Sequence, residues 1–351
     1  MLTTVLGIES SLPSIRSPCR HDEDDPPRLN TAPGLRATCA VIGTRAGWDR
    51  RPRDSGQPSL GPVCPLPPDP DDHRKHKYDT TAGEGTDIYI LDDGIDGTHS
   101  EFNGRYIWHI DPRVPERMLP SNMGHGTAVA GVAAGQFCGV AKKANIIDVQ
   151  IGANTSFVTT DILQGLDAVL ERASRLNKQN RSVAIASWGK ADCQAPVIDK
   201  FRELFMSSIP LVVAAGDDSV NSSGSCFDSM AHEYGFLVGA ITHDYERWSW
   251  SNWGPAIDLF APGFDIEVPL SHHDHRSRGK EFDEWVREFG TSLAAPFVGG
   301  TVAYLRAYDE DFRNASVSDL KTWMKYYATK DILTRIKDSP NNLLYTVIWG
   351  Q

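Results

Sequence analysis

The sequence contains a carboxylate, an imidazole and a hydroxyl in positions where they could act on one reaction. Asp92 ends a short apolar run, His125 begins a stretch rich in Ala and Gly, and Ser292 follows Gly290 at the start of a helical stretch. Taken singly, a serine at a helix start or an aspartate at a strand end usually only caps or turns the chain. Together they match a triad in which serine attacks, histidine removes its proton and the carboxylate orients the histidine. The sequence therefore predicts nucleophilic catalysis by Ser292.

Alternating strands and helices from residue 80 onward would bring these residues together. Apolar runs typical of strands buried on both faces of a parallel sheet occur at 87–93, 145–151, 182–188, 210–216, 236–241 and 257–263. Strand–helix alternation predicts an α/β fold of three layers, with helices on both faces of a mostly parallel central sheet. In such sheets the active site lies at the carboxyl ends of the strands, where Asp92 is expected.

Apolar stripes at helical spacing predict the helices between these strands. One stripe follows a cap candidate at Thr160 and consists of Ile162, Leu166, Val169, Ala173 and Leu176. A second stripe consists of Val197, Phe201, Leu204 and Phe205. Ser316 and Asp319 resemble a capping box before Leu320 and Met324, and stretches beginning at His125 and near Ser292 complete the set.

The charge distribution divides the chain into two parts. Residues 1–76 are rich in Pro, and residues 1–75 hold 12 of the 22 prolines and equal numbers of basic and acidic residues. We predict a disordered leader over 1–76, without a recognisable signal peptide or propeptide, and one catalytic domain over 77–351. The domain then carries the whole net charge of -11, which argues against a nucleic-acid partner. No apolar run reaches the roughly 18–20 residues of a membrane span, so no membrane association is expected.

Seven segments in the same order resemble those of subtilisin-like serine proteases, most closely the fungal proteinase K-like branch. They are GEGTDIYILDDGIDGTHSEFNGR (83–105), GHGTAVAG (124–131), ASWG (186–189), VVAAGD (212–217), SNWGPAIDLFAPG (251–263), GTSLAAP (290–296) and NNLLYT (341–346). The order Asp, His, Ser along the chain is also that of subtilisin.

The resemblance implies a subtilisin-like fold and a serine endopeptidase with Asp92, His125 and Ser292 as its triad. It implies that Ser187, Trp188 and Gly189 pair with an extended peptide and line the primary specificity pocket, with Trp188 at the rim rather than in the core. A stretch around Ala153 to Thr159 would form the opposite wall. Expected partners are protein or peptide substrates, the protein is expected to be a monomer, and the chemistry requires no cofactor. The family also implies an extracellular location.

Asp217 is the main departure from the family pattern. Most subtilisins have Asn after the strand-ending AAG, and its amide donates to the oxyanion of the tetrahedral intermediate. A carboxyl group donates only when it is protonated. An ionised carboxylate about 3 Å from the oxyanion would repel it by about 5 kcal/mol at an effective dielectric near 20. Asp217 is therefore either a protonated donor or the cause of a slow or inactive enzyme.

Smaller departures occur at Lys190, where a second Gly usually follows, and at Ala128, where many relatives have His. Neither removes a catalytic group.

The resemblance further suggests a structural calcium ion, bound by the Asp258 carboxylate and by carbonyls near Glu233 and Gly235. Calcium prefers six to eight oxygen ligands, of which one carboxylate supplies only a part. The segment 271–285 contains three histidines, and we interpret it as a solvated insertion rather than a metal site. Cys138, Cys193 and Cys226 are an odd number in the catalytic part, so at most one pair forms within it.

The sequence thus predicts peptide-bond hydrolysis through an acyl-enzyme on Ser292, with activity lowered by Asp217 in the oxyanion hole. The alternative is a catalytically weak or inactive relative that binds peptides.

Overall fold

The fold is taken from a computed structural model. It describes residues 37–39, 81–102, 105, 107–110, 124–153, 156–188, 194–222, 231–277, 284–345 and 347–349. Within the predicted leader only Ala37–Cys39 (β1) is described, as a strand antiparallel to Val347–Trp349 (β15). The rest of the predicted leader lies outside the described residues.

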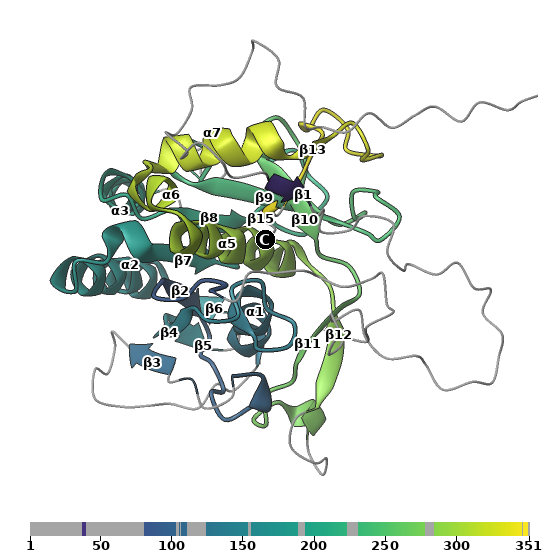
Figure 1. Ribbon diagram of the computed structural model, residues 1–351. Helices are drawn as coiled ribbons and strands as arrows, with labels where there is room; N and C mark the ends of the chain where they lie inside the picture. Colours follow the sequence, from purple (N-terminus) through teal and green to yellow (C-terminus); the bar gives the residue numbers. More distant parts are fainter. Residues whose placement is uncertain are drawn as a thin grey trace, which may run out of the picture.

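Within the described residues, nine strands form the central sheet (Figure 1). Their order is β13 (Thr329–Lys330), β14 (Asn342–Leu343), β10 (Leu259–Pro262), β9 (Phe236–Ile241), β8 (Leu211–Ala214), β7 (Ser182–Ala186), β2 (Asp87–Asp92), β4 (Asn145–Gln150) and β3 (Ile107–Ile110). All neighbours are parallel except β13 and β14. The six predicted strands are confirmed, each shorter than its apolar run or equal to it.

Helices cover both faces of this sheet and complete three layers. Their bounds are α1 (His125–Ala134), α2 (Thr159–Arg175), α3 (Ala195–Met206), α5 (Thr291–Tyr308), α6 (Glu310–Asn314) and α7 (Val317–Tyr327). Side chains of α1, α5, α6 and α7 pack in one apolar cluster with one face of the strands. Side chains of α2 and α3 pack in a second cluster against the other face. The predicted αβα architecture is therefore confirmed.

Two predictions at helix ends had different outcomes. Ser316 caps α7 as expected, because its hydroxyl oxygen accepts a hydrogen bond from the amide of Asp319. The prediction for α2 was wrong at both ends. Val158, not Thr160, is the N-cap residue, and Leu176 is an exposed C-cap residue rather than part of the buried stripe.

Two hairpins and three short 3₁₀ helices complete the described elements. The hairpins are β5 (Gly152–Ala153) with β6 (Ser156–Phe157), and β11 (Ile266–Pro269) with β12 (Trp285–Glu288). The 3₁₀ helices are η1 (Ser100–Phe102), η2 (Gln179–Arg181) and η4 (His275–Ser277). In the described part of the chain, every helix is too short or too polar to traverse a bilayer.

Candidate active site

Asp92 and His125 form a hydrogen-bonded pair at the carboxyl edge of the sheet. Asp92 is the last residue of β2 and is fully buried, and His125 is the first residue of α1. The His125 Nδ1 atom lies 2.8 and 3.0 Å from the two carboxylate oxygens of Asp92. Gly126 permits this approach, because a β-carbon there would lie 2.5 Å from the carbonyl oxygen of Gly94. The carboxylate therefore fixes the orientation of the imidazole.

The charge of Asp92 changes the acidity of His125. Burial alone lowers the pKa of the imidazole, because it disfavours the charged form. The nearby negative charge and hydrogen bond of Asp92 outweigh burial and raise the pKa of His125 to about 9. Asp93, itself buried beside Asp92, has its pKa raised to about 7 by burial and by that neighbouring charge. His125 is therefore a strong base that binds a proton readily.

Ser292 is the second residue of α5, and its place depends on the glycine before the helix. Gly290 has φ 141°, in the region that favours glycine. A β-carbon on Gly290 would lie 2.9 Å from the Ser292 Oγ atom and 3.0 Å from an oxygen of Asp217. Ser292 and His125 line the same cavity of about 120 Å³. The structure thus brings the hydroxyl, the imidazole and the buried carboxylate to one site.

A proline in α5 explains the role of Ser187. Pro296 has no N–H, so it cannot donate to the carbonyl of Ser292 four residues earlier in the helix. The hydroxyl of Ser187 donates to that carbonyl instead, at 2.9 Å. Ser187 follows β7, so this bond attaches the first turn of α5 to the edge of the sheet.

Asp217 lies between the end of β8 and the start of α5. Its Oδ1 atom accepts hydrogen bonds from the amide and the hydroxyl of Thr291, at 2.9 and 2.8 Å. The Thr291 hydroxyl oxygen in turn accepts from the amide of Gly216 at 3.0 Å. Burial raises the pKa of Asp217, and the two bonds from Thr291 reduce that increase. The carboxyl group therefore caps α5 through one oxygen, while the other lies beside Gly290 and Ser292.

Comparison with known proteins decides the family. The model of the subtilase family matches residues 83–342. The chain belongs to the subtilase family.

Two relatives among curated proteins come from fungi. Subtilisin-like protease 3 of Pseudogymnoascus destructans is 35% identical over 272 residues, covering 77% of this chain and 64% of the relative. Subtilisin-like protease 2 of Trichophyton rubrum is 32% identical, covering 78% of this chain and 61% of that protein. The chain thus spans less than two thirds of the length of these relatives. A crystal structure described as a cold adapted subtilisin-like serine proteinase is 27% identical with a TM-score of 0.67, covering 78% of this chain and 92% of that one.

The side chain of Trp188 in this subtilase is buried in the core. It is 5% exposed and belongs to the core cluster beneath the sheet edge. The indole N–H donates to the carbonyl of Leu91 at 2.9 Å, and the ring packs 6.0 Å from that of Phe157. The prediction for its side chain was therefore wrong, because a hydrogen-bond partner inside the fold allows the indole to be buried. Gly189, Lys190 and part of the predicted opposite wall lie outside the described residues.

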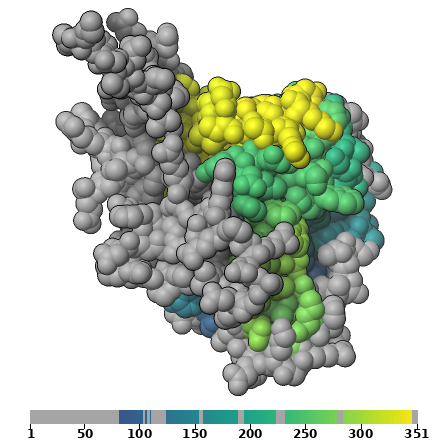
Figure 2. All heavy atoms as spheres, turned by 90° about the vertical axis from the view of Figure 1, so that its right-hand side faces the viewer, coloured from purple at the N-terminus to yellow at the C-terminus, as the bar shows by residue number. Residues whose placement is uncertain are grey.

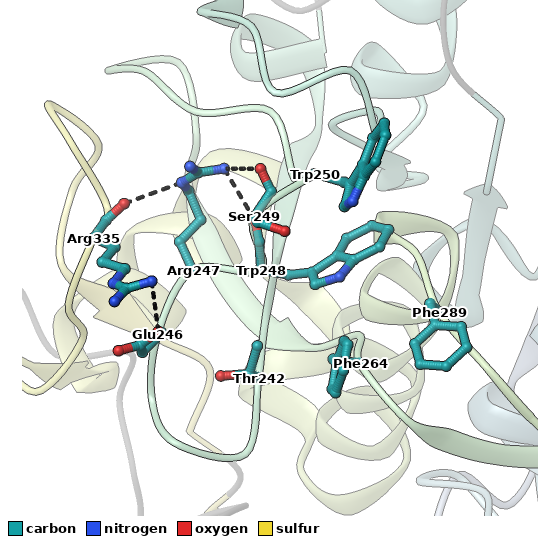
Figure 3. Close-up of a pocket in the computed structure, with 9 residues that line it drawn as sticks. All are labelled: Thr242, Glu246, Arg247, Trp248, Ser249, Trp250, Phe264, Phe289 and Arg335. Carbon is teal, nitrogen blue, oxygen red and sulfur yellow. Dashed lines mark hydrogen bonds and ion pairs between the residues drawn. The ribbon is translucent and has the colours of Figure 1, made fainter.

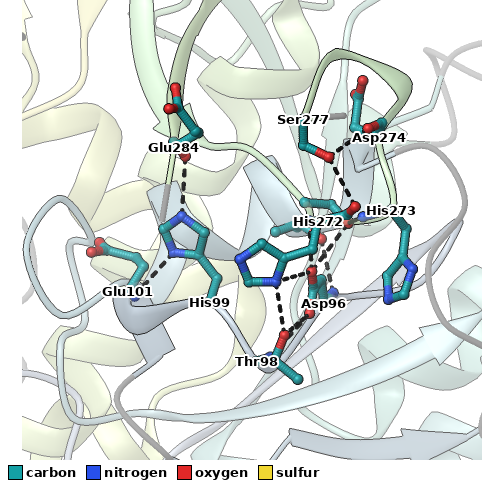
Figure 4. A network of polar contacts seen from close by, with 11 residues as sticks. Asp96, Thr98, His99, Glu101, His272, His273, Asp274, Ser277 and Glu284 are labelled. Carbon is teal, nitrogen blue, oxygen red and sulfur yellow. Dashed lines mark hydrogen bonds and ion pairs between the residues drawn. The ribbon is translucent and has the colours of Figure 1, made fainter. Parts of the chain in front are cut away.

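The segment after β11 is packed against the site in part, whereas a solvated insertion was predicted: Ser271 and Asp274 are buried, and His273 and Arg276 are exposed. The buried carboxylate of Asp96 accepts the backbone amide of His272 at 2.8 Å, and the His272 ring lies 3.2 Å from the same oxygen (Figure 4). His99 lies beside His272 and makes a hydrogen bond to the carbonyl of Glu284 at 3.1 Å. These contacts fix the β11–β12 hairpin next to the segment that follows Asp92.

The sequence analysis did not predict two charged residues of the cavity, because their positions depend on the β11–β12 hairpin. Arg276 and Glu288 line the cavity with His125, as does Ala128. The Arg276 side chain pairs with Glu288 and, at 2.7 Å, with the buried Asp274. The only sequence feature that indicated the position of Glu288 is its closeness to Ser292 in the chain.

A second, larger pocket of about 530 Å³ lies on the side of Phe289, which lines both spaces. Its walls divide into an aromatic side of Trp248, Trp250, Phe264 and Phe289 and a charged side of Glu246, Arg247 and Arg335 (Figure 3). Trp250 is 62% exposed and Phe289 is also exposed, so part of the aromatic side lies at the surface of the described residues.

Asp258 does not line the catalytic cavity, and its carboxylate contacts two lysine side chains and one histidine ring. Lys321, Lys325 and His232 all lie within 3.2 Å of its carboxylate. In the described residues, no group of three or more His, Cys, Asp or Glu side chains could hold a metal ion. The residues present therefore do not fit the calcium site that the family resemblance implied.

Proposed function

We propose that this subtilase is a serine endopeptidase with Asp92, His125 and Ser292 as its catalytic triad. The observation that carries the proposal is the hydrogen bond between Asp92 and His125, together with the cavity that His125 and Ser292 both line. With Nδ1 held by the carboxylate, the other ring nitrogen is the one available to the serine hydroxyl. The subtilase family and the protease names of its relatives support the same activity.

The reaction follows from these roles. His125 takes the proton of Ser292 as its oxygen attacks the carbonyl carbon of a peptide bond, and a tetrahedral oxyanion forms. The protonated His125, stabilised by Asp92, then gives the proton to the leaving amine, and an acyl-enzyme remains. Water, deprotonated by His125, attacks this ester and releases the second product. The chemistry needs no cofactor.

Asp217 is proposed to donate to the oxyanion when it is protonated. Its Oδ1 atom already accepts two hydrogen bonds from Thr291, so the proton belongs on Oδ2, the oxygen beside Gly290 and Ser292. The backbone N–H of Ser292 would be the second donor. The burial that raises the pKa of Asp217 favours this protonated form.

The substrate is proposed to be an extended protein or peptide segment. Ser187, Trp188 and Gly189 would contact it through the backbone, since the side chain of Trp188 is buried. Apolar or aromatic residues are expected before the scissile bond. Phe289 lines both the catalytic cavity and the aromatic pocket, so it offers an apolar surface beside the cavity for a bound peptide.

The protein is also proposed to act as an extracellular monomer, without nucleic-acid or membrane partners. A disulfide at Cys138 supports an oxidising location, and the acidic net charge of -11 disfavours nucleic acid.

The presence of Asp217 in the oxyanion site also favours the alternative function, in which the protein binds peptides and has little or no activity. In its ionised form the carboxylate repels the oxyanion and cannot donate to it. The groove would then bind peptides without cleaving them.

The two functions are separated by the products formed from a denatured protein. The wild-type chain and Ser292→Ala are incubated with it, and new peptide termini are identified by mass spectrometry. New termini only with the wild type support the peptidase. Equal products with both proteins, or none with either, would leave the binding function as the better account.

The raised pKa of His125 predicts a pH profile shifted to alkaline values. His125 must be neutral to accept the proton of Ser292. In Asp217→Asn, where no carboxyl group of the oxyanion site has to be protonated, kcat/KM should therefore increase with pH through an apparent pKa well above the ordinary 6.5, toward about 9. Glu288→Gln, added to Asp217→Asn, is a matched test, because the charge of Glu288 also raises the pKa of His125. Loss of that charge should move the acid limb of the pH profile slightly to lower pH. An acid limb at or below 6.5 in Asp217→Asn would show that Asp92 does not control the base.

A further inference from the structure

The buried carboxylate of Asp258 contacts two lysine ammonium groups and a histidine ring where α7 packs on the sheet. Its Oδ2 atom lies 2.8 Å from the Lys321 ammonium and accepts the amide of Leu237 at 3.0 Å. Its Oδ1 atom lies 3.2 Å from the Lys325 ammonium and 2.9 Å from the His232 ring. Both oxygens of the carboxylate are thus in contact with donor groups of the protein itself.

Lys321 also bonds two backbone carbonyl groups in the segment where the family resemblance placed calcium ligands near Glu233 and Gly235. Its ammonium donates to the carbonyl of His232 and, at 2.9 Å, to that of Gly235. With Asp258 these make three acceptors, which equals the number of N–H donors on an ammonium. The side chain is only 13% exposed, and its charged end lies 6.0 Å from the centre of the Phe236 ring. The cation is therefore enclosed and fully hydrogen-bonded.

A calcium ion has no place in this arrangement. It would need six to eight oxygen ligands, and the carboxylate and carbonyl oxygens here are already bound to the ammonium. It would also stand beside two lysine ammonium groups with a single carboxylate to offset three cations.

We propose that the ammonium of Lys321 takes the place of a structural calcium ion and anchors α7 to the sheet as a covalently attached cation. Lys321 is on α7, while its acceptors lie before β9 and before β10, two neighbouring strands. Figure 2 shows the yellow C-terminal part of the chain lying directly on the green segments of this face. The stability of this region then does not depend on free calcium, and the inference is independent of the proposed catalysis.

The test compares melting temperatures with excess EDTA and with millimolar calcium, all in the full chain carrying Ser292→Ala so that self-cleavage cannot distort the result. The reference chain should melt at the same temperature in both conditions. Lys321→Ala leaves a buried carboxylate without its main partner and should melt about 5–10 °C lower in EDTA. It also vacates the site, so calcium should raise its melting temperature by several degrees. Lys325→Ala is the control, because it removes a cation that contacts Asp258 but neither carbonyl, and calcium should not change its stability.

The comparison of the calcium effects decides the proposal. An equal calcium effect in the reference chain and in Lys321→Ala would overturn it, as would strong destabilisation of the reference chain by EDTA with none in the variant. If Lys321→Ala does not fold, Lys321→Met fills the same volume without the charge. It should melt lower without any response to calcium, and a Lys321→Met protein as stable as the reference would show that the ammonium is not an anchor.

Discussion

Ser292→Ala is expected to lower kcat for a peptide substrate by several orders of magnitude, up to the loss of about 10⁶-fold measured when the serine of a subtilisin is removed. The variant loses the atom that forms the acyl-enzyme. The remaining groups can only bind the substrate and stabilise charge, which leaves a small residual rate. Initial rates of the variant and the wild type are measured on a fluorogenic peptide at several substrate concentrations. These rates separate the loss in kcat from any change in KM.

Ser316→Ala is the matched control for that measurement. It is the same substitution at the cap of α7, outside the catalytic cavity, and should lower the free energy of unfolding by about 1 kcal/mol without changing kcat. Both variants should keep the circular dichroism of the wild type. Activity of folded Ser292→Ala close to that of wild type would contradict the assignment of the nucleophile.

Asp217→Asn is expected to raise kcat at neutral pH by about 100–1,000-fold, the effect of one oxyanion donor as measured in a subtilisin. The Asn oxygen can keep the bonds from Thr291, and its amide then stands where Oδ2 of Asp217 lies, beside Gly290 and Ser292. An amide donates at every pH, whereas the carboxyl group donates only when protonated.

The shape of the pH profile should change as well. The wild type requires a neutral His125, favoured by high pH, together with a protonated Asp217, favoured by low pH. Since the pKa of His125 is raised to about 9, the two requirements are met together only in a small fraction of molecules, which predicts a bell-shaped profile with a low maximum. Asp217→Asn removes the acidic requirement, so its profile should rise with pH and then level off.

Asp218→Asn controls for the loss of a charge near the site. Asp218 is the next residue in the chain, and its charge raises the pKa of Asp217 only as a secondary cause. Its replacement should change kcat far less than Asp217→Asn does. If Asp217→Asn gives no increase at neutral pH, the carboxylate does not limit the reaction.

Local patterns predicted the layers of the fold because each depends on neighbouring residues in the chain. The run at 236–241 coincides with β9, since all six residues are buried and continuous apolar runs require cover on both faces. Ser316 capped α7 for a similarly local reason, since its partner is three residues away. The failure at Thr160 shows the limit of such signals, because Val158 began α2 without any side-chain cap.

Features that depend on distant residues could not be predicted in this way. Trp188 is buried because Leu91, 97 residues earlier, offers it a carbonyl group. Residue 272 packs against Asp96 across 176 positions of the chain, which no local composition indicates. The cation at Asp258 is the clearest case, since the motif around it resembles a calcium site and only the packing of α7 brings Lys321 there.

Covalent labelling by a fluorophosphonate probe tests the central claim most directly, because the probe reacts only with a serine that a neighbouring base activates. Mass spectrometry of the digested wild type should find the label on Ser292, with little or none in His125→Ala, and faster labelling in Asp217→Asn. Labelling of another residue, or none in folded wild-type protein from acidic to alkaline pH, would contradict the Asp92–His125–Ser292 triad.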